Sequence, residues 1–129
     1  MMKANERQVA GSHYRKPIQH WDYVIGNKHS YLGGQASKYI SRWKDKNGVM
    51  DLDKADHFLE KMIDAHHNPP APVLPEIYAE AQELDENQKL IVSLVDIYEQ
   101  THDVSVLGIA RAALAMYREQ HTSSQNGAS

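Results

Sequence analysis

The chain of 129 residues has no cysteine and few purely apolar aromatic side chains, with one phenylalanine and two tryptophans against seven tyrosines. Without cysteine, disulfides, thiolate zinc sites, thiol nucleophiles and iron–sulfur clusters are excluded. No apolar run approaches the roughly 20 residues of a membrane-spanning helix, and the amino-terminal segment lacks the apolar core of a secretion signal. We therefore expect a cytoplasmic protein with no membrane partner.

The charge is unevenly distributed along a chain whose net charge is −3. Residues 1–68 carry eleven basic and eight acidic side chains, whereas residues 69–129 carry three basic and nine acidic ones. Six of the eight histidines also lie in the first part. The first part is therefore where an anion would bind, and a small anionic ligand is expected rather than a nucleic acid, whose binding requires many neutralised phosphates.

Four of the five prolines lie between Pro69 and Pro75, which predicts a stiff linker over residues 69–75. The linker separates an amino-terminal lobe, residues 1–68, from a carboxy-terminal lobe, residues 76–121. Each lobe is too small to bury a large core, so we expect one domain in two lobes. No strand pattern occurs, and the periodicity predicts an all-α fold.

Three helices are expected in the first lobe. Pro17 opens a short helix that Gly26 ends, with Ile18, Trp21 and Ile25 on its apolar stripe. A second helix covers residues 32–46 with Gly48 as a left-handed cap, and a third starts with Asp51 as N-cap. The short loop between the second and third helices predicts an antiparallel hairpin.

The second lobe repeats the helical pattern. Residues 75–98 fit one long helix or two helices broken near residues 84–87. Asp103 is expected to cap a last helix whose alanines favour close pairing, followed by a disordered tail at residues 122–129. The inward side of that helix is predicted to contain Val106, Leu107, Ala110, Ala113, Leu114 and Tyr117.

A row of cations follows the second predicted helix. Lys38, Arg42 and Lys46 recur at every fourth position, and the hairpin would bring Lys54 towards Lys38 and Arg42. Such a cluster suits a phosphate, for which Arg42 offers a bidentate clamp. The alternative is a solvated face paired with acids such as Asp45.

Gly33 and Gly34 weaken the start of the same helix by about 1 kcal/mol each relative to alanine, so they require a reason. One reason is a close backbone approach that offers N–H donors to an anion. The other, which we favour on this motif alone, is a turn or packing against another helix.

Several motifs occur in order over residues 8–66, about half the chain. They are Gly11-Ser12-His13-Tyr14, Ile18-Gln19-His20-Trp21-Asp22-Tyr23, Gly34-Gln35-Ala36-Ser37-Lys38-Tyr39-Ile40-Ser41-Arg42, Lys46-Asn47-Gly48 and Asp51-Leu52-Asp53-Lys54-Ala55. In this order they resemble a family of small phage proteins, one member of which is a deoxynucleoside monophosphate kinase without a Walker motif. The family usually has asparagine where this chain has Gln35.

The resemblance implies phosphoryl transfer from a nucleoside triphosphate to a deoxynucleoside monophosphate, by a homo-oligomer in the cytoplasm of an infected host cell. Lys38 and Arg42 are the candidate catalytic residues. The candidate substrate- and phosphate-binding residues are His13, Tyr14, Asp22, Gly34, Gln35, Lys46 and Lys54. Mg²⁺ bound with the nucleotide is the one cofactor considered, and Asp22 and Asp51 are weighed as its ligands or as partners that orient a cationic clamp, although the N-cap role is preferred for Asp51. No protein metal site is expected, because His57, His66 and His67 lack a converging acid.

Two other functions stay open. The same cationic surface could capture a nucleotide without turnover or dock a host protein, making the chain a binding module. Alternatively, Glu80 and Glu83 with Asp96 and Glu99 form two carboxylate pairs that, on facing helices, would resemble the Mg²⁺ site of an all-α nucleoside triphosphate pyrophosphohydrolase.

Overall fold

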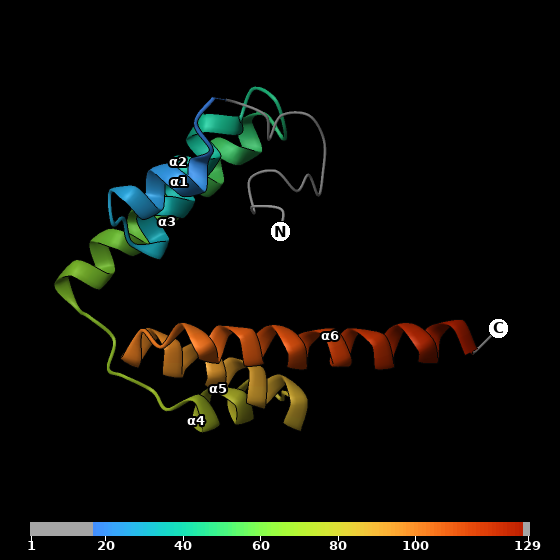
Figure 1. Ribbon diagram of the computed structural model, residues 1–129. Coiled ribbons are helices and arrows are strands. Elements are labelled where there is room, and N and C mark those ends of the chain that lie inside the picture. Colours follow the sequence, from blue (N-terminus) through green and yellow to red (C-terminus); the bar gives the residue numbers. More distant parts are fainter. Residues whose placement is uncertain (1–16, 128–129) are drawn as a thin grey trace. The chain divides into compact units, whose positions relative to one another are not determined.

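The structure is a computed structural model that describes residues 17–127, with side chains described up to residue 122, and this part contains six helices and no strand. The all-α prediction is therefore confirmed. The chain divides into two compact units between Pro70 and Ala71, within the proline-rich segment. Unit 1 contains α1 (His20–Gly26), α2 (Tyr31–Arg42) and α3 (Val49–His67), and unit 2 contains α4 (Pro75–Ala81), α5 (Glu86–Thr101) and α6 (Val104–Gly127) (Figure 1).

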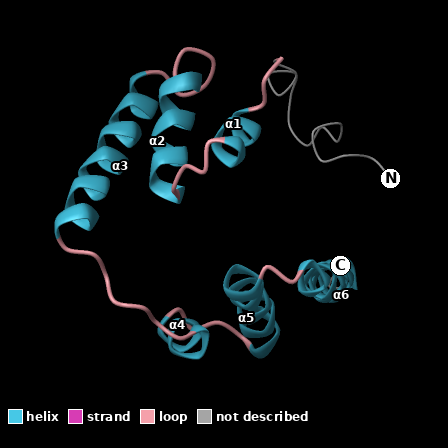
Figure 2. Cartoon of the chain, turned by 60° about the vertical axis from the view of Figure 1, so that its left-hand side comes forward, coloured by secondary structure: helices cyan, strands magenta, loops and turns pink. Residues whose placement is uncertain are grey.

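In unit 1 the helix α2 lies between α1 and α3 (Figure 2). The α2–α3 hairpin forms as predicted, with the small side chains of Ala36 and Ala55 buried between the helices. Alanine at such positions lets two helix backbones approach closely. Tyr39 of α2 and Phe58 of α3 extend the contact, their rings stacked at 5.8 Å between centroids and 10° between planes.

Helix α1 differs from its prediction in both its start and its packing. It begins at His20, three residues after Pro17, and Ile18 and Ile25 of the predicted apolar stripe are 74% and 71% exposed. The side chain that packs on α2 is Val24, whose Cγ1 would lie 3.3 Å from a Cβ placed on Gly34. The glycine at position 34 is thus explained by helix packing, the second of the two reasons considered.

The connection between α2 and α3 corrects two expectations. Helix α2 ends at Arg42 rather than residue 46, and its chain turns at Gly48, which has a φ of 60° and donates its N–H to the Trp43 carbonyl at 2.9 Å. A positive φ favours glycine. Because α3 starts at Val49, Asp51 lies inside its first turn and is not the N-cap.

Unit 2 is also a row of three helices, with α5 between α4 and α6 (Figure 2). Two helices rather than one cover residues 75–101, because the chain reverses between them with Glu83 at a φ of 56°. Asp85 then starts α5 through a capping box in which it accepts the Gln88 N–H and the Gln88 side chain accepts the Asp85 N–H. Ala79 and Ala110 are the buried apolar residues described in this unit.

Asp103 precedes α6 and accepts the Ser105 N–H at 3.0 Å, so the predicted cap is confirmed. Tyr117 donates its hydroxyl to Asp85, which joins α6 to the start of α5. Two expectations fail. Leu114, predicted on the inward side of the last helix, is 53% exposed. The tail predicted at residues 122–129 is mostly helical, since α6 continues to Gly127 and no proline or glycine between Gly108 and Gly127 interrupts it. No helix in the part of the chain described here has the length and apolar character needed to cross a membrane.

Candidate functional site

Three cations of unit 1 gather around one aromatic ring. The Lys38 Nζ, Arg42 Cζ and Lys54 Nζ atoms lie 5.0, 4.6 and 5.3 Å from the centroid of the Tyr39 ring. These are distances at which the negative face of the ring attracts a cation. The predicted convergence of the two lysines and the arginine therefore occurs, and we call these three residues with Tyr39 the Tyr39 cluster.

Asp51 holds the guanidinium of the cluster in place. Its side chain is fully buried, and its Oδ2 accepts from Arg42 Nε at 3.3 Å. The Asn47 N–H also donates to Oδ2 at 3.4 Å, and Asn47 Nδ2 donates to Oδ1 at 3.5 Å. Burial raises the pKa of Asp51, but the Asn47 and Arg42 hydrogen bonds and the Arg42 charge outweigh it and leave the pKa below its usual value. Asp51 thus positions Arg42. The sequence analysis considered this role for Asp51 but preferred that of an N-cap.

The two lysines of the cluster have no such carboxylate. Within the described residues, neither Lys38 nor Lys54 forms an ion pair, and the recorded partner of each ammonium group is the Tyr39 ring. With one carboxylate among three cations, the cluster keeps a formal charge of +2. An excess of fixed positive charge at one place is the arrangement that binds a phosphate.

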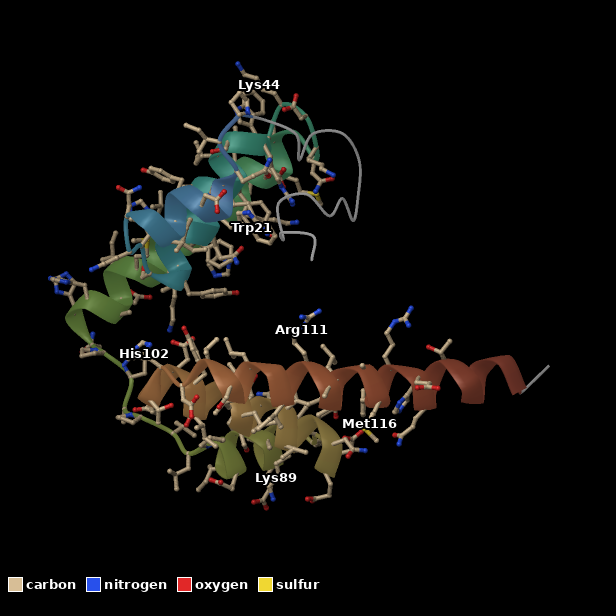
Figure 3. All side chains as sticks on the ribbon, viewed as in Figure 1. Trp21, Lys44, Lys89, His102, Arg111 and Met116 are labelled. Atoms are coloured by element: carbon tan, nitrogen blue, oxygen red, sulfur yellow. The ribbon has the colours of Figure 1, made fainter. Side chains whose placement is uncertain are left out.

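A pocket of about 210 Å³ opens between α1 and the start of α2. Its wall includes side chains of α1, of the connecting loop and of α2, and it reaches Lys38, so it adjoins the cluster. Figure 3 shows Trp21 at the surface beside α1, where it is 49% exposed. The residues that line the pocket are His20, Trp21, Val24, His29, Ser30, Tyr31, Gly34, Gln35 and Lys38.

His20 connects α1 to α2 at the edge of this pocket. Its Nε2 lies 2.7 Å from Ser37 Oγ, and the Ser37 hydroxyl donates to the Gly34 carbonyl at 3.2 Å. Burial is the main cause that lowers the pKa of His20, and Coulombic interactions with Lys38 and His29 lower it further. The lowered pKa favours the neutral imidazole, and the bond to Ser37 joins α1 to α2.

Neither N–H group of the glycine pair is offered to an anion, because both donate to Ser30. The Gly33 N–H donates to Ser30 Oγ at 3.1 Å, and the Gly34 N–H donates to the Ser30 carbonyl at 2.8 Å. These bonds complete the amino-terminal cap of α2. Gly34 contributes to the candidate site as part of the pocket wall.

The predicted site residues differ in where the structure places them. Lys38, Arg42 and Lys54 form the cluster, and Gly34, Gln35 and again Lys38 line the pocket. Lys46 and Asp22 belong to neither. Lys46, the last member of the predicted cation row, lies in the turns after α2 because the helix ends at Arg42, and Asp22 is exposed in the first turn of α1. His13 and Tyr14 lie outside the described residues.

Two residues of the site were missed by the sequence analysis. Tyr39 was assigned to the apolar stripe, although its spacing of three from Arg42 on a helix is a signal for contact. Asp51 was weighed as a group that orients a cationic clamp, but the N-cap role was preferred, and its complete burial was not predicted.

The carboxylate pairs of unit 2 do not form a metal site. Glu80 lies in α4, Glu83 in the turn after it, and Asp96 and Glu99 in α5. Over residues 17–122, no group of three or more histidine, aspartate or glutamate side chains could hold a metal ion. The geometry expected of an all-α pyrophosphohydrolase is therefore not present at these pairs.

A scan of the chain against protein-family models matches no family, and searches of curated proteins and of solved structures find no similar protein. The resemblance of residues 8–66 to the phage family thus depends on its motifs.

Proposed function

We propose that unit 1 binds the phosphate of a deoxynucleoside monophosphate at the Tyr39 cluster, and that the chain transfers to it a phosphoryl group from a nucleoside triphosphate. The observation that carries the proposal is the meeting of Lys38, Arg42 and Lys54 at one ring with a single carboxylate among them. The motif resemblance supplies the reaction.

Phosphoryl transfer requires positioned positive charge more than covalent help from the protein. Arg42 suits the clamp role because Asp51 fixes its orientation before any ligand arrives, which reduces the entropy lost on binding. Lys38 and Lys54 act as point charges from two different helices, so a phosphate at the cluster is attracted by both α2 and α3. A Mg²⁺ ion would accompany the donor triphosphate and balance part of its charge.

The test is product formation by the full chain. Purified protein is incubated with each deoxynucleoside monophosphate and a triphosphate, with and without Mg²⁺, and the nucleotides are separated by chromatography. Formation of a deoxynucleoside diphosphate supports the proposal. Unchanged nucleotides with measurable binding overturn the transfer step and favour a capture module, and pyrophosphate release from the triphosphate favours hydrolysis instead.

A matched pair of variants tests the cluster itself. Lys54→Met and Lys61→Met remove the same charge from exposed positions of α3, but only Lys54 adjoins the Tyr39 ring. Loss of a charged hydrogen bond costs about 1.5 kcal/mol at the lower end of its range, which suits an exposed lysine, so Lys54→Met is expected to weaken monophosphate binding about tenfold. Equal affinities of the two variants in calorimetric titration would refute the assignment.

We also propose that the chain forms a homo-oligomer through α6. Between Val104 and Met116 the single charged residue is Arg111, which projects from the face of α6 turned away from α5 (Figure 3). Ile109 and Met116 of the same helix are 56% and 63% exposed, and apolar area of this kind is what an interface covers. Sedimentation showing a monomer at micromolar concentration would overturn this proposal.

A further inference from the structure

We propose that the pocket between α1 and α2 binds the nucleobase of the ligand, with the phosphate directed along α2 towards the Tyr39 cluster. This inference rests on the proposed function and adds to it the orientation of the nucleotide and the residues that contact its base.

The size and walls of the pocket suit one aromatic ring system. Its 210 Å³ is below the roughly 300–1,000 Å³ of sites that enclose a whole small molecule, so it accommodates a part of a ligand. Trp21 and Tyr31 supply aromatic surface and Val24 supplies an aliphatic wall. Aromatic side chains bind bases of any sequence by stacking, because every base has a π-face.

The polar groups of the pocket match a base better than a phosphate. Gln35 presents an amide that both donates and accepts hydrogen bonds, as the edge of a base requires. Against a phosphate, the wall offers one permanent cation, Lys38, since its other two basic side chains, His20 and His29, are imidazoles. The cluster offers three cations, so the anionic end of a nucleotide is favoured there.

Lys38 sets the direction of the ligand. It lines the pocket and also contacts the Tyr39 ring, so the two sites share a side chain. Gly34, Lys38 and Arg42 follow at intervals of four residues on one face of α2, and each interval advances about 6 Å along the helix axis. With its base beside Gly34, the nucleotide extends its 5′-phosphate along α2 towards Lys38 and Arg42.

Fluorescence titration tests this orientation. In a Trp43→Phe background, Trp21 is the remaining tryptophan and reports on the pocket. The probes are a deoxynucleoside, the matching deoxynucleoside monophosphate and inorganic phosphate. We expect the nucleoside to quench Trp21, and the monophosphate to bind more tightly than either of the other two.

Two variants separate the ends of the ligand. Tyr31→Ala changes a side chain that is 72% exposed, so the fold is retained, and removal of a stacking partner is expected to weaken nucleoside and monophosphate binding about tenfold while leaving inorganic phosphate unaffected. Lys54→Met should weaken monophosphate and phosphate but not the nucleoside. Tyr78→Ala, at a 48% exposed tyrosine of unit 2, is the control and should leave the binding of all three probes unchanged.

The outcomes distinguish this inference from the proposed function. If phosphate binds in a Lys54-dependent manner but the nucleoside does not, and the monophosphate binds no more tightly than phosphate, the base pocket is refuted while the cluster stands. If the nucleoside binds in a Tyr31-dependent manner, but inorganic phosphate does not bind and Lys54→Met does not weaken monophosphate binding, the pocket is supported and the proposed phosphate site fails.

Discussion

Two helical glycines provide a direct test of how α1 is held on α2. Gly34→Ala in unit 1 and Gly108→Ala in unit 2 both replace glycine inside a helix, a change that favours the helix by about 1 kcal/mol. The difference between them is space. A Cβ on Gly34 would lie 3.3 and 3.4 Å from the two Cγ atoms of Val24, whereas a Cβ on Gly108 meets nothing within 4 Å.

The expected effects follow from adding the two terms. Overpacking costs about 1–3 kcal/mol, and the lower end applies here because Val24 must move by only a few tenths of an ångström. Gly34→Ala should therefore leave the free energy of unfolding of unit 1 about unchanged or lower it slightly. Gly108→Ala should stabilise unit 2 by about 1 kcal/mol, since no packing term opposes the helix propensity.

The two tryptophans make the assay specific to a unit. Trp21 and Trp43 both belong to unit 1, so urea unfolding followed by fluorescence reports on that unit, while far-ultraviolet circular dichroism reports on both. A Gly34→Ala protein that is stabilised as much as Gly108→Ala would refute the close contact between α1 and α2, and with it the pocket wall that this contact forms.

Two further predictions concern pH. The folded-state pKa of Asp51 is lowered, so its contribution to stability is full at neutral pH and is lost as pH falls below about 4; Asp51→Asn should be less stable than the parent at pH 7 in fluorescence-detected urea unfolding, and the difference should shrink towards pH 3. For His20 the pKa is also lowered, so the unfolded chain binds the proton more readily and the stability of unit 1 falls as pH drops below about 6.5. His20→Gln should reduce the loss of stability between pH 7 and pH 5, and an unchanged loss would contradict the burial of that imidazole.

Much of the fold could be predicted from the sequence because its signals are local. The proline cluster marked the boundary region, Asp103 marked the start of α6, and the periodic apolar residues identified the helices of the α2–α3 hairpin. Such signals depend on neighbours within one or two turns. The helix ends were less predictable: α2 stops at Arg42 because the turn at Gly48 and the Asp51 hydrogen bonds compete with a further helical turn.

The site was predictable to the extent that it depends on helix geometry. Spacing placed Lys38 and Arg42 on one face, and the hairpin brought Lys54 to them. The pocket was not predictable, because it depends on which side of α1 meets α2. The apolar stripe of α1 favoured Trp21 and Ile25 as buried residues, but the two side chains are exposed, and Val24 packs on α2 at Gly34, where no Cβ is in the way.

The burial of Asp51 reconciles the acidic net charge of the chain with the proposed phosphate site. An exposed carboxylate beside three cations would compete with a phosphate for them. Asp51 is instead enclosed and accepts its hydrogen bonds from Asn47 and from the Nε of Arg42, so the terminal nitrogens of the guanidinium are not used by this bond. The cluster keeps a formal +2, close in magnitude to the roughly −1.5 to −2 charge of a phosphate monoester at pH 7. The carboxylate that partly neutralises the cluster is therefore also the group that prepares Arg42 for its ligand.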